Sequence, residues 1–154
     1  MTAAKNIYRT DICRVFEIPE RYRAVIRDID QEIEQVRAGF CAGSPGMSFA
    51  PGGGGGSKRD LSTYYARVED LLKCRKAAVN RREMAVQAVL MILRDCENET
   101  AKKLFLLVYV QGISRREAAE KCGKSYDCAY KIMQREISRL IKKYQCNEER
   151  RATA

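Results

Sequence analysis

Polar, charged and aromatic side chains near the C-terminal end of the chain are of the types that read the edges of DNA bases. They are Tyr126, Asp127, Tyr130, Lys131 and Gln134. A lysine can pair with guanine, a glutamine with adenine, an aspartate with cytosine, and a tyrosine ring can contact the thymine methyl group. We expect these five side chains on the solvent face of one helix, whose N-terminal part would reach the bases in a major groove.

Basic side chains surround these positions and could neutralise phosphates. The candidates, with one serine hydroxyl, are Arg115, Arg116, Lys121, Lys124, Ser125, Arg135 and Arg139. Residues 101–154 hold thirteen basic and six acidic side chains, whereas residues 1–40 hold seven of each, and the net charge of the chain is +9. Clustered positive charge is what counterion release from DNA requires, although a solvated basic surface would have the same composition.

The other residue types favour no catalytic or metal site. The chain has no histidine, and its seven cysteines show no CxxC spacing, which argues against the usual zinc ligand sets and histidine-based acid–base catalysis. Ser57 and Lys58 follow a glycine-rich stretch, but a phosphate-binding loop needs lysine before serine or threonine, after a strand. We expect no enzyme, no cofactor and no metal, and we expect reduced, mostly buried thiols.

Two helices joined by a tight turn are predicted to position the candidate residues. Ser114 is predicted to cap a short helix over residues 115–122, with Glu117 completing a capping box. Gly123 would end that helix in a left-handed conformation, and Ser125 would cap a longer helix. The apolar residues of the longer helix recur every three or four positions. They are Ala129, Ile132, Met133, Ile137, Leu140, Ile141 and Tyr144.

The offsets across this turn predict a helix-turn-helix. Ala119, Gly123 and Ile132 occupy the positions where such a motif needs a small residue, a turn glycine and a core aliphatic residue. A preceding helix over residues 101–110 should pack across the pair and complete a trihelical core. The alternative is a helical bundle that happens to contain a tight corner.

The segment from Ser114 to Leu140 resembles, without a gap, region 4 of bacterial RNA polymerase sigma factors. The chain also resembles small phage and prophage sigma-like regulators of late transcription of the RinA type, which have a helical arm, a glycine-rich loop and a C-terminal helix-turn-helix. The resemblance implies base reading by Tyr126, Asp127, Tyr130 and Lys131, and RNA polymerase as a partner. No counterpart of sigma region 2 is recognisable, so we do not expect a complete sigma factor.

Two helices with heptad-spaced apolar residues are predicted before this domain. The first would cover residues 20–38, with Pro19 beginning its first turn. The second would run from residue 60 to about 95, with a stripe that Arg75 and Arg82 interrupt. The stripe consists of Leu61, Tyr65, Val68, Leu72, Val79, Val86, Val89 and Leu93. We expect an antiparallel helical hairpin, and a homodimer through the exposed remainder of the stripe.

The expected fold is therefore all-α. It comprises an N-terminal helical segment (1–38), a flexible glycine-rich loop (39–59), a long helix that pairs with the first (60–96), a sigma region 4-like helix-turn-helix domain (97–145) and a disordered tail (146–154). No apolar run is long enough to span a bilayer, and the N-terminus does not resemble a signal peptide. We expect a cytoplasmic protein that does not bind membranes.

The expected function is sequence-specific binding of double-stranded DNA by a transcriptional regulator, a phage late-gene activator that acts at a promoter with RNA polymerase. An alternative is the DNA-recognition (small) subunit of a phage packaging terminase, which also combines a helix-turn-helix with helical oligomerisation. The mass of the protein in solution distinguishes them, because a packaging subunit would form a ring of many copies.

Overall fold

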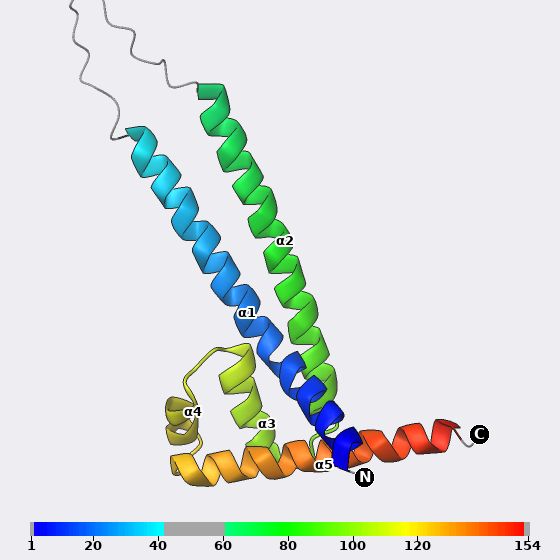
Figure 1. Ribbon diagram of the computed structural model, residues 1–154. Coiled ribbons are helices and arrows are strands. Elements are labelled where there is room, and N and C mark those ends of the chain that lie inside the picture. Colours follow the sequence, from blue (N-terminus) through cyan, green and yellow to red (C-terminus); the bar gives the residue numbers. More distant parts are fainter. Residues whose placement is uncertain (1, 42–60, 153–154) are drawn as a thin grey trace, which may run out of the picture. The chain divides into compact units, whose positions relative to one another are not determined.

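The computed structural model describes the backbone of residues 2–41 and 61–152, and within these ranges every regular element is helical. The predicted all-α fold class is confirmed. The elements are α1 (Thr2–Cys41), α2 (Leu61–Arg94), α3 (Glu99–Phe105), the π-helix η1 (Leu106–Val110), α4 (Arg115–Lys121) and α5 (Tyr126–Ala152) (Figure 1). None of the described helices is long and apolar enough to cross a membrane. The predicted loop over residues 39–59 lies almost entirely outside the described residues.

The chain divides into two compact units. The terminal unit contains residues 1–21 and 82–154, and the arm unit contains residues 22–81. Helices α1 and α2 each contribute to both units, so the boundary passes through helices and not through a linker. The predicted boundary near residue 97 lies instead at the polar stretch 96–100 that follows α2.

In the arm unit, α1 and α2 run antiparallel. Asp30 binds Arg75 at 2.6 Å, and further along α1 the ring of Phe40 stacks on Tyr64, with centroids 4.3 Å apart. Residue numbers thus rise along α1 as they fall along α2. The ion pair also explains why an arginine interrupts the apolar stripe of α2, because Arg75 meets a carboxylate on α1.

The core of the terminal unit combines α3, α4 and α5 with the beginning of α1 and the end of α2. Phe16 of α1 is fully buried and stacks on Phe105 of α3, with ring centroids 4.9 Å apart and planes 5° apart. Val89 and Leu93 of α2 are buried in the same cluster. This core therefore includes residues that lie outside the predicted domain 97–145.

Two predicted helix ends differ from the structure. Helix α1 begins at Thr2 and holds Pro19 in its interior, so the prediction that Pro19 begins a helix is wrong. The buried residues Ile12 and Phe16 keep the preceding turns helical by packing, although proline removes one backbone hydrogen bond. Helix α5 continues to Ala152 and does not end near Tyr144. Glutamine, glutamate, arginine and alanine predominate after Tyr144, and all favour helices.

Candidate nucleic-acid interface

Helix α4 begins and ends where local chemistry predicts. The Ser114 hydroxyl accepts a hydrogen bond from the Glu117 N–H at 3.2 Å, which makes Ser114 the N-cap. The Glu117 carboxylate lies 3.2 Å from Lys121 Nζ, so it forms an ion pair along the helix in place of the reciprocal half of a capping box. The cap thus depends on Ser114.

The turn after α4 has the hydrogen bonds of a Schellman motif. Gly123 adopts φ +62°, its N–H donates to the Glu120 carbonyl, and the Lys124 N–H donates to the Ala119 carbonyl, both at 2.9 Å. The Ser125 hydroxyl then accepts from the Cys128 N–H at 3.3 Å and caps α5. These bonds bring the last turn of α4 directly to the first turn of α5.

Small side chains allow α4 and α5 to pack closely. Ala118 and Ala119 of α4 are 0% and 1% exposed, and Ala129 of α5 is 3% exposed. Met133 and Ile137 continue the buried face of α5. Because this face is used for packing, the opposite face of α5 is left to solvent.

Four of the five candidate base-reading side chains lie on that solvent face. Tyr126, Asp127, Tyr130 and Lys131 are exposed, and the two tyrosine side chains retain nearly half of their accessible area. Gln134, one turn further along, is half-buried. The exposed group thus occupies the first turn and a half of α5, immediately after the turn.

Some of the candidate phosphate-binding side chains already have partners within the terminal unit. Arg115 donates to the hydroxyl of Tyr109 at 3.4 Å, and the proximity of that phenol, followed by Tyr126, raises the pKa of Arg115. Lys121 pairs with Glu117, and the Ser125 oxygen accepts the cap bond, although its O–H can still donate.

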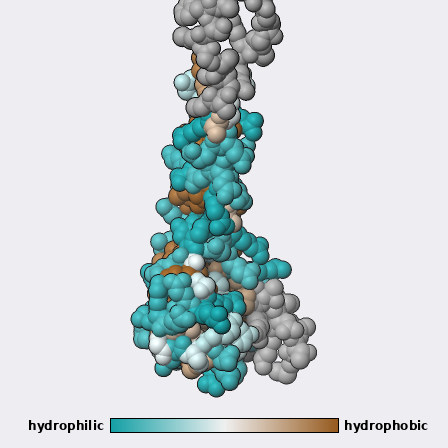
Figure 2. Space-filling view, turned by 90° about the vertical axis from the view of Figure 1, so that its left-hand side faces the viewer, coloured by the Kyte–Doolittle hydropathy of each residue, from teal (hydrophilic) through white to brown (hydrophobic). Residues whose placement is uncertain are grey.

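Four basic side chains on this surface are exposed and show no ion pair within the described part of the chain. They are Arg116, Lys124, Lys131 and Arg135. Figure 2 views the molecule from the side on which α4 and the beginning of α5 lie in Figure 1, and the surface there is mostly hydrophilic. This surface suits a charged partner better than an apolar one.

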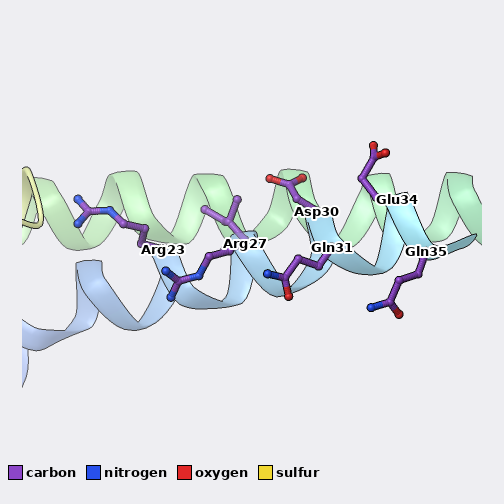
Figure 3. A pocket seen from close by; sticks show the side chains of 7 residues that line it. Arg23, Arg27, Asp30, Gln31, Glu34 and Gln35 are labelled. Atoms are coloured by element: carbon purple, nitrogen blue, oxygen red, sulfur yellow. The ribbon is translucent and has the colours of Figure 1, made fainter. Parts of the chain in front are cut away.

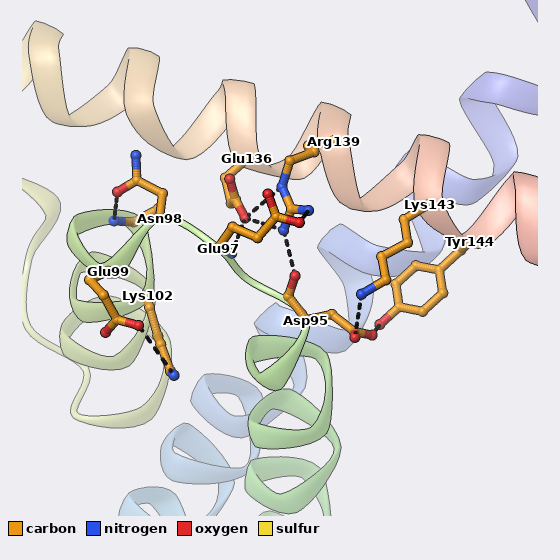
Figure 4. Close-up of polar contacts among 10 residues, drawn as sticks. Asp95, Glu97, Asn98, Glu99, Lys102, Glu136, Arg139, Lys143 and Tyr144 are labelled. Atoms are coloured by element: carbon orange, nitrogen blue, oxygen red, sulfur yellow. Dashed lines mark hydrogen bonds and ion pairs between the residues drawn. The ribbon is translucent and has the colours of Figure 1, made fainter.

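Arg139, also a candidate for phosphate binding, is already engaged in ion pairs within the terminal unit. Its guanidinium lies 2.7 Å from Glu136 and 2.6 Å from Glu97, and it also donates to the Asp95 carbonyl (Figure 4). The guanidinium thus joins α5 to the connection between α2 and α3. Arg139 could not be distinguished from its exposed neighbours because its partners on the connection, the Glu97 carboxylate and the Asp95 carbonyl, lie about forty residues earlier in the sequence.

Asp95 extends this polar cluster along α5. Its carboxylate accepts from Lys143 at 2.7 Å and from the Tyr144 hydroxyl at 2.8 Å (Figure 4). These bonds lower the pKa of Asp95, whereas burial and the bond to Asp95 raise the pKa of Tyr144 to about 12. Lys143 is therefore also engaged within the protein.

Glu136 lies at the centre of the same cluster and is only 6% exposed. Burial acts to raise its pKa, but hydrogen bonds from Arg139 and from the Glu97 N–H outweigh burial and leave the pKa below its usual value. Glu136 is thus an ionised carboxylate whose neighbours compensate its burial.

The thiols are less buried than predicted. Among the described side chains only Cys96 is buried, whereas Cys74, Cys128 and Cys146 are exposed. Burial raises the pKa of Cys96 to about 11, with the Glu136 charge as the second cause. The prediction of mostly buried thiols is wrong because small apolar side chains are easily tolerated on the solvent face of a helix.

Elsewhere, a shallow groove follows one side of α1 in the arm unit (Figure 3). Arginine, glutamine and acidic side chains, among them Arg23, Asp30 and Gln35, line it together with Ile26. No group of histidine, cysteine and acidic residues that could hold a metal ion is present among the described residues. The groove offers polar side chains from a single helix and no arrangement of a nucleophile with a base.

Comparisons of the chain with models of protein families, with curated proteins and with solved structures found no match. The surface formed by α4, the turn and the beginning of α5 is therefore the candidate functional site.

Proposed function

We propose that the chain is a sequence-specific DNA-binding transcriptional regulator, in which α4 and α5 act as a helix-turn-helix and α5 enters the major groove. The observation that carries the proposal is the exposed group of Tyr126, Asp127, Tyr130 and Lys131 on the first turns of a capped helix. In DNA-bound motifs of this kind, the N-terminal residues of the second helix contact base edges while the first helix crosses the backbone.

The charge of the surrounding surface supports the same proposal. Arg116, Lys124 and Arg135 are exposed and have no ion pair within the described ranges, so they can neutralise phosphates without losing an existing partner. Each phosphate contact releases counterions and makes the affinity fall with salt. Such contacts set the position of the protein on the duplex, while the side chains of α5 supply sequence preference.

The resemblance of Ser114–Leu140 to sigma region 4 extends the proposal to a promoter. In this proposal the protein is a phage late-gene activator that binds near a promoter and contacts RNA polymerase. Lys124 stands where sigma factors commonly have an aliphatic residue, and the buried Glu136 departs from an apolar face. We therefore propose no particular promoter sequence.

Selection from a random duplex library tests the proposal. The full chain is incubated with the library, and bound fragments are sequenced over successive rounds. We expect one motif of a few base pairs to be enriched, and a fluorescence titration at fixed salt to show tighter binding to that motif than to a shuffled duplex. Equal affinity for both duplexes at every salt concentration would contradict specific reading of bases.

A matched variant separates the surface from the net charge of the protein. Lys131→Ala removes one charge from the beginning of α5, whereas Lys73→Ala removes one charge from an exposed position of α2 that pairs with Glu69 and Asp70. We expect the first to weaken binding to the selected motif and the second to leave it nearly unchanged. Equal losses would indicate attraction by net charge alone.

A further inference from the structure

Part of the apolar surface of α2 in the arm unit stays exposed beside the face that contacts α1. Tyr64 and Arg75 contact α1, and Ala78 is 6% exposed. By contrast, Tyr65 and Leu72 are 65% and 47% exposed. The face of α2 that contacts α1 is therefore not centred on the predicted apolar stripe. As a result, large apolar side chains of the stripe remain exposed to solvent.

These side chains have the periodicity of a helix-packing seam. Tyr65, Leu72 and Val79 follow one another at intervals of seven residues, and Leu61 and Val68 lie beside them on the helix surface. Leu61, Tyr65 and Leu72 are exposed, and the two valines are half-buried. An apolar residue at every seventh position stays on one side of a long helix and packs against another helix. Single exposed apolar residues are common on protein surfaces, but a line with this spacing is not a scattered set.

We propose that this seam binds a second copy of the chain, with the two α2 helices antiparallel about a two-fold axis at Leu72. Such an axis places Leu72 opposite the partner's Leu72. It also places Tyr65, seven residues before the axis, opposite the partner's Val79, which lies seven residues after it. A large side chain then meets a small one on both sides of the axis, as a self-complementary interface requires.

Charges beside the seam favour the antiparallel arrangement. Glu69 and Lys76 each lie four residues after a seam position and therefore flank the seam on the same side. The two-fold axis brings Glu69 next to the partner's Lys76, and it does so twice. In a parallel pair in register, Glu69 would lie level with the partner's Glu69, and the partner's Lys76 would be about 10 Å further along the helix.

Both charges are available for such a contact. Lys76 is exposed and forms no ion pair with any described residue. Glu69 pairs with Lys73 at 2.9 Å within the same helix, but the two side chains are 68% and 67% exposed. An exposed pair of this kind contributes little to stability, so Glu69 can exchange it for a contact with a second copy.

Sedimentation velocity of the full chain without DNA tests the oligomeric state over a range of protein concentrations. We expect a reversible dimer with twice the 17.6 kDa mass of the chain. Leu72→Glu places two carboxylates on the axis and should leave only monomer. Met84→Glu is the control, since Met84 is also on α2 and 73% exposed but lies off the seam; this variant should remain a dimer with unchanged helix content.

Charge exchange tests the antiparallel register. Glu69→Lys and Lys76→Glu each place like charges together twice and should weaken dimerisation by about fivefold or more. The double exchange should restore the wild-type dissociation constant. Glu69→Lys raises the net charge of the chain and Lys76→Glu lowers it. If both variants dimerise more weakly, net charge cannot be the cause.

The proposal would be overturned by a monomer at every concentration, by a Leu72→Glu variant that still dimerises, or by a double exchange as weak as the two single changes combined. A ring of many copies would also contradict it and would favour the packaging alternative. All these measurements omit DNA, so their failure is distinguishable from failure of the proposed DNA binding.

Discussion

Arg139 forms a close ion pair with Glu136, its Nη2 lying 2.7 Å from a carboxylate oxygen that the protein almost entirely covers. The same guanidinium binds Glu97 at 2.6 Å, on the connection between α2 and α3. Removal of one partner leaves a buried charge without compensation, which costs more than the pair itself contributes. We expect Arg139→Ala to lower the free energy of unfolding by about 2–4 kcal/mol.

Thermal and urea unfolding followed by circular dichroism measure this loss. Arg135→Ala is the control, because Arg135 is an exposed arginine one turn earlier on α5, and its loss should change the free energy of unfolding by less than about 0.5 kcal/mol. The double variant Arg139→Met with Glu136→Gln should recover part of the stability, since it removes both charges. If Arg139→Ala and Arg135→Ala have the same free energy of unfolding, the cluster does not stabilise the contact between α5 and the connection after α2.

The stability of the terminal unit should fall in acid because of the same cluster. Hydrogen bonds from Lys143 and Tyr144 hold the pKa of Asp95 below its ordinary 3.8. Hydrogen bonds to Glu136 outweigh the effect of its burial and hold its pKa below the ordinary 4.5. A group with a lowered folded pKa contributes stability above its unfolded pKa and loses it as pH falls through the folded value.

Urea unfolding at pH 7 and at several pH values below 4.5 tests this dependence. We expect a steep decrease in the unfolding midpoint below about pH 4.5 in the wild type, and a shallower decrease in Asp95→Asn, which has one such group fewer. Asp28→Asn serves as the control, because Asp28 is an exposed aspartate of the arm unit. If the unfolding midpoint falls with pH equally steeply in the wild type and in Asp95→Asn, the role assigned to Asp95 is contradicted.

The parts of the fold that sequence predicts are those that local chemistry decides. Ser114, Gly123 and Ser125 occupy a cap, a left-handed turn and a second cap, and each of these depends on backbone groups within a few residues. The start and end of α4 and the beginning of α5 therefore follow from the sequence. The alternating spacing of the apolar residues also predicts which side of α5 is buried.

The parts that sequence does not predict depend on distant partners. Phe16 packs on Phe105 across nearly ninety residues of chain, and no periodicity reveals that contact. Similarly, Arg82 interrupts an apolar stripe because it donates to the Val110 carbonyl at 3.3 Å, at the end of η1. The exposure of the candidate interface residues follows from helix periodicity. The ion pairs of Arg139 do not, because they depend on which residues of the folded chain face its guanidinium.

The exposure of the thiols predicts a wide range of alkylation rates. Cys128 and Cys146 are exposed on α5, whereas Cys96 is buried and has a pKa raised to about 11. Since the thiolate is the reactive form, Cys96 should react with iodoacetamide at pH 8 at least about a hundredfold more slowly than Cys128, because its thiolate fraction is smaller and burial hinders access.

Peptide mass spectrometry after timed alkylation measures both rates in the same sample. In urea sufficient to unfold the chain, the rates should become similar, which controls for local sequence effects on reactivity. Equal rates in the folded protein would mean that the connection after α2 opens readily and that Cys96 is not held in the core.

Two exposed basic residues, one on α5 and one on α4, should have different effects on DNA binding if α5 reads bases and α4 contacts phosphates. Lys131 lies on the exposed beginning of α5, and Arg116 lies on the first turn of α4. Lys131→Ala should cost about 1–3 kcal/mol on the selected motif and little on a shuffled duplex, and Tyr130→Ala should likewise reduce preference. Arg116→Ala should weaken binding to both duplexes alike and lower the salt slope by about 1.

Fluorescence anisotropy with both duplexes at several salt concentrations separates these effects. The ratio of the two dissociation constants reports reading of bases, and the slope against salt reports phosphate contacts, so one set of titrations assigns each residue. Lys131→Arg is the conservative control, because it keeps the charge and can still pair with guanine, and it should retain most of the preference. If Lys131→Ala and Arg116→Ala lower affinity equally on both duplexes, the beginning of α5 contacts only the backbone, and its exposed tyrosines do not read sequence.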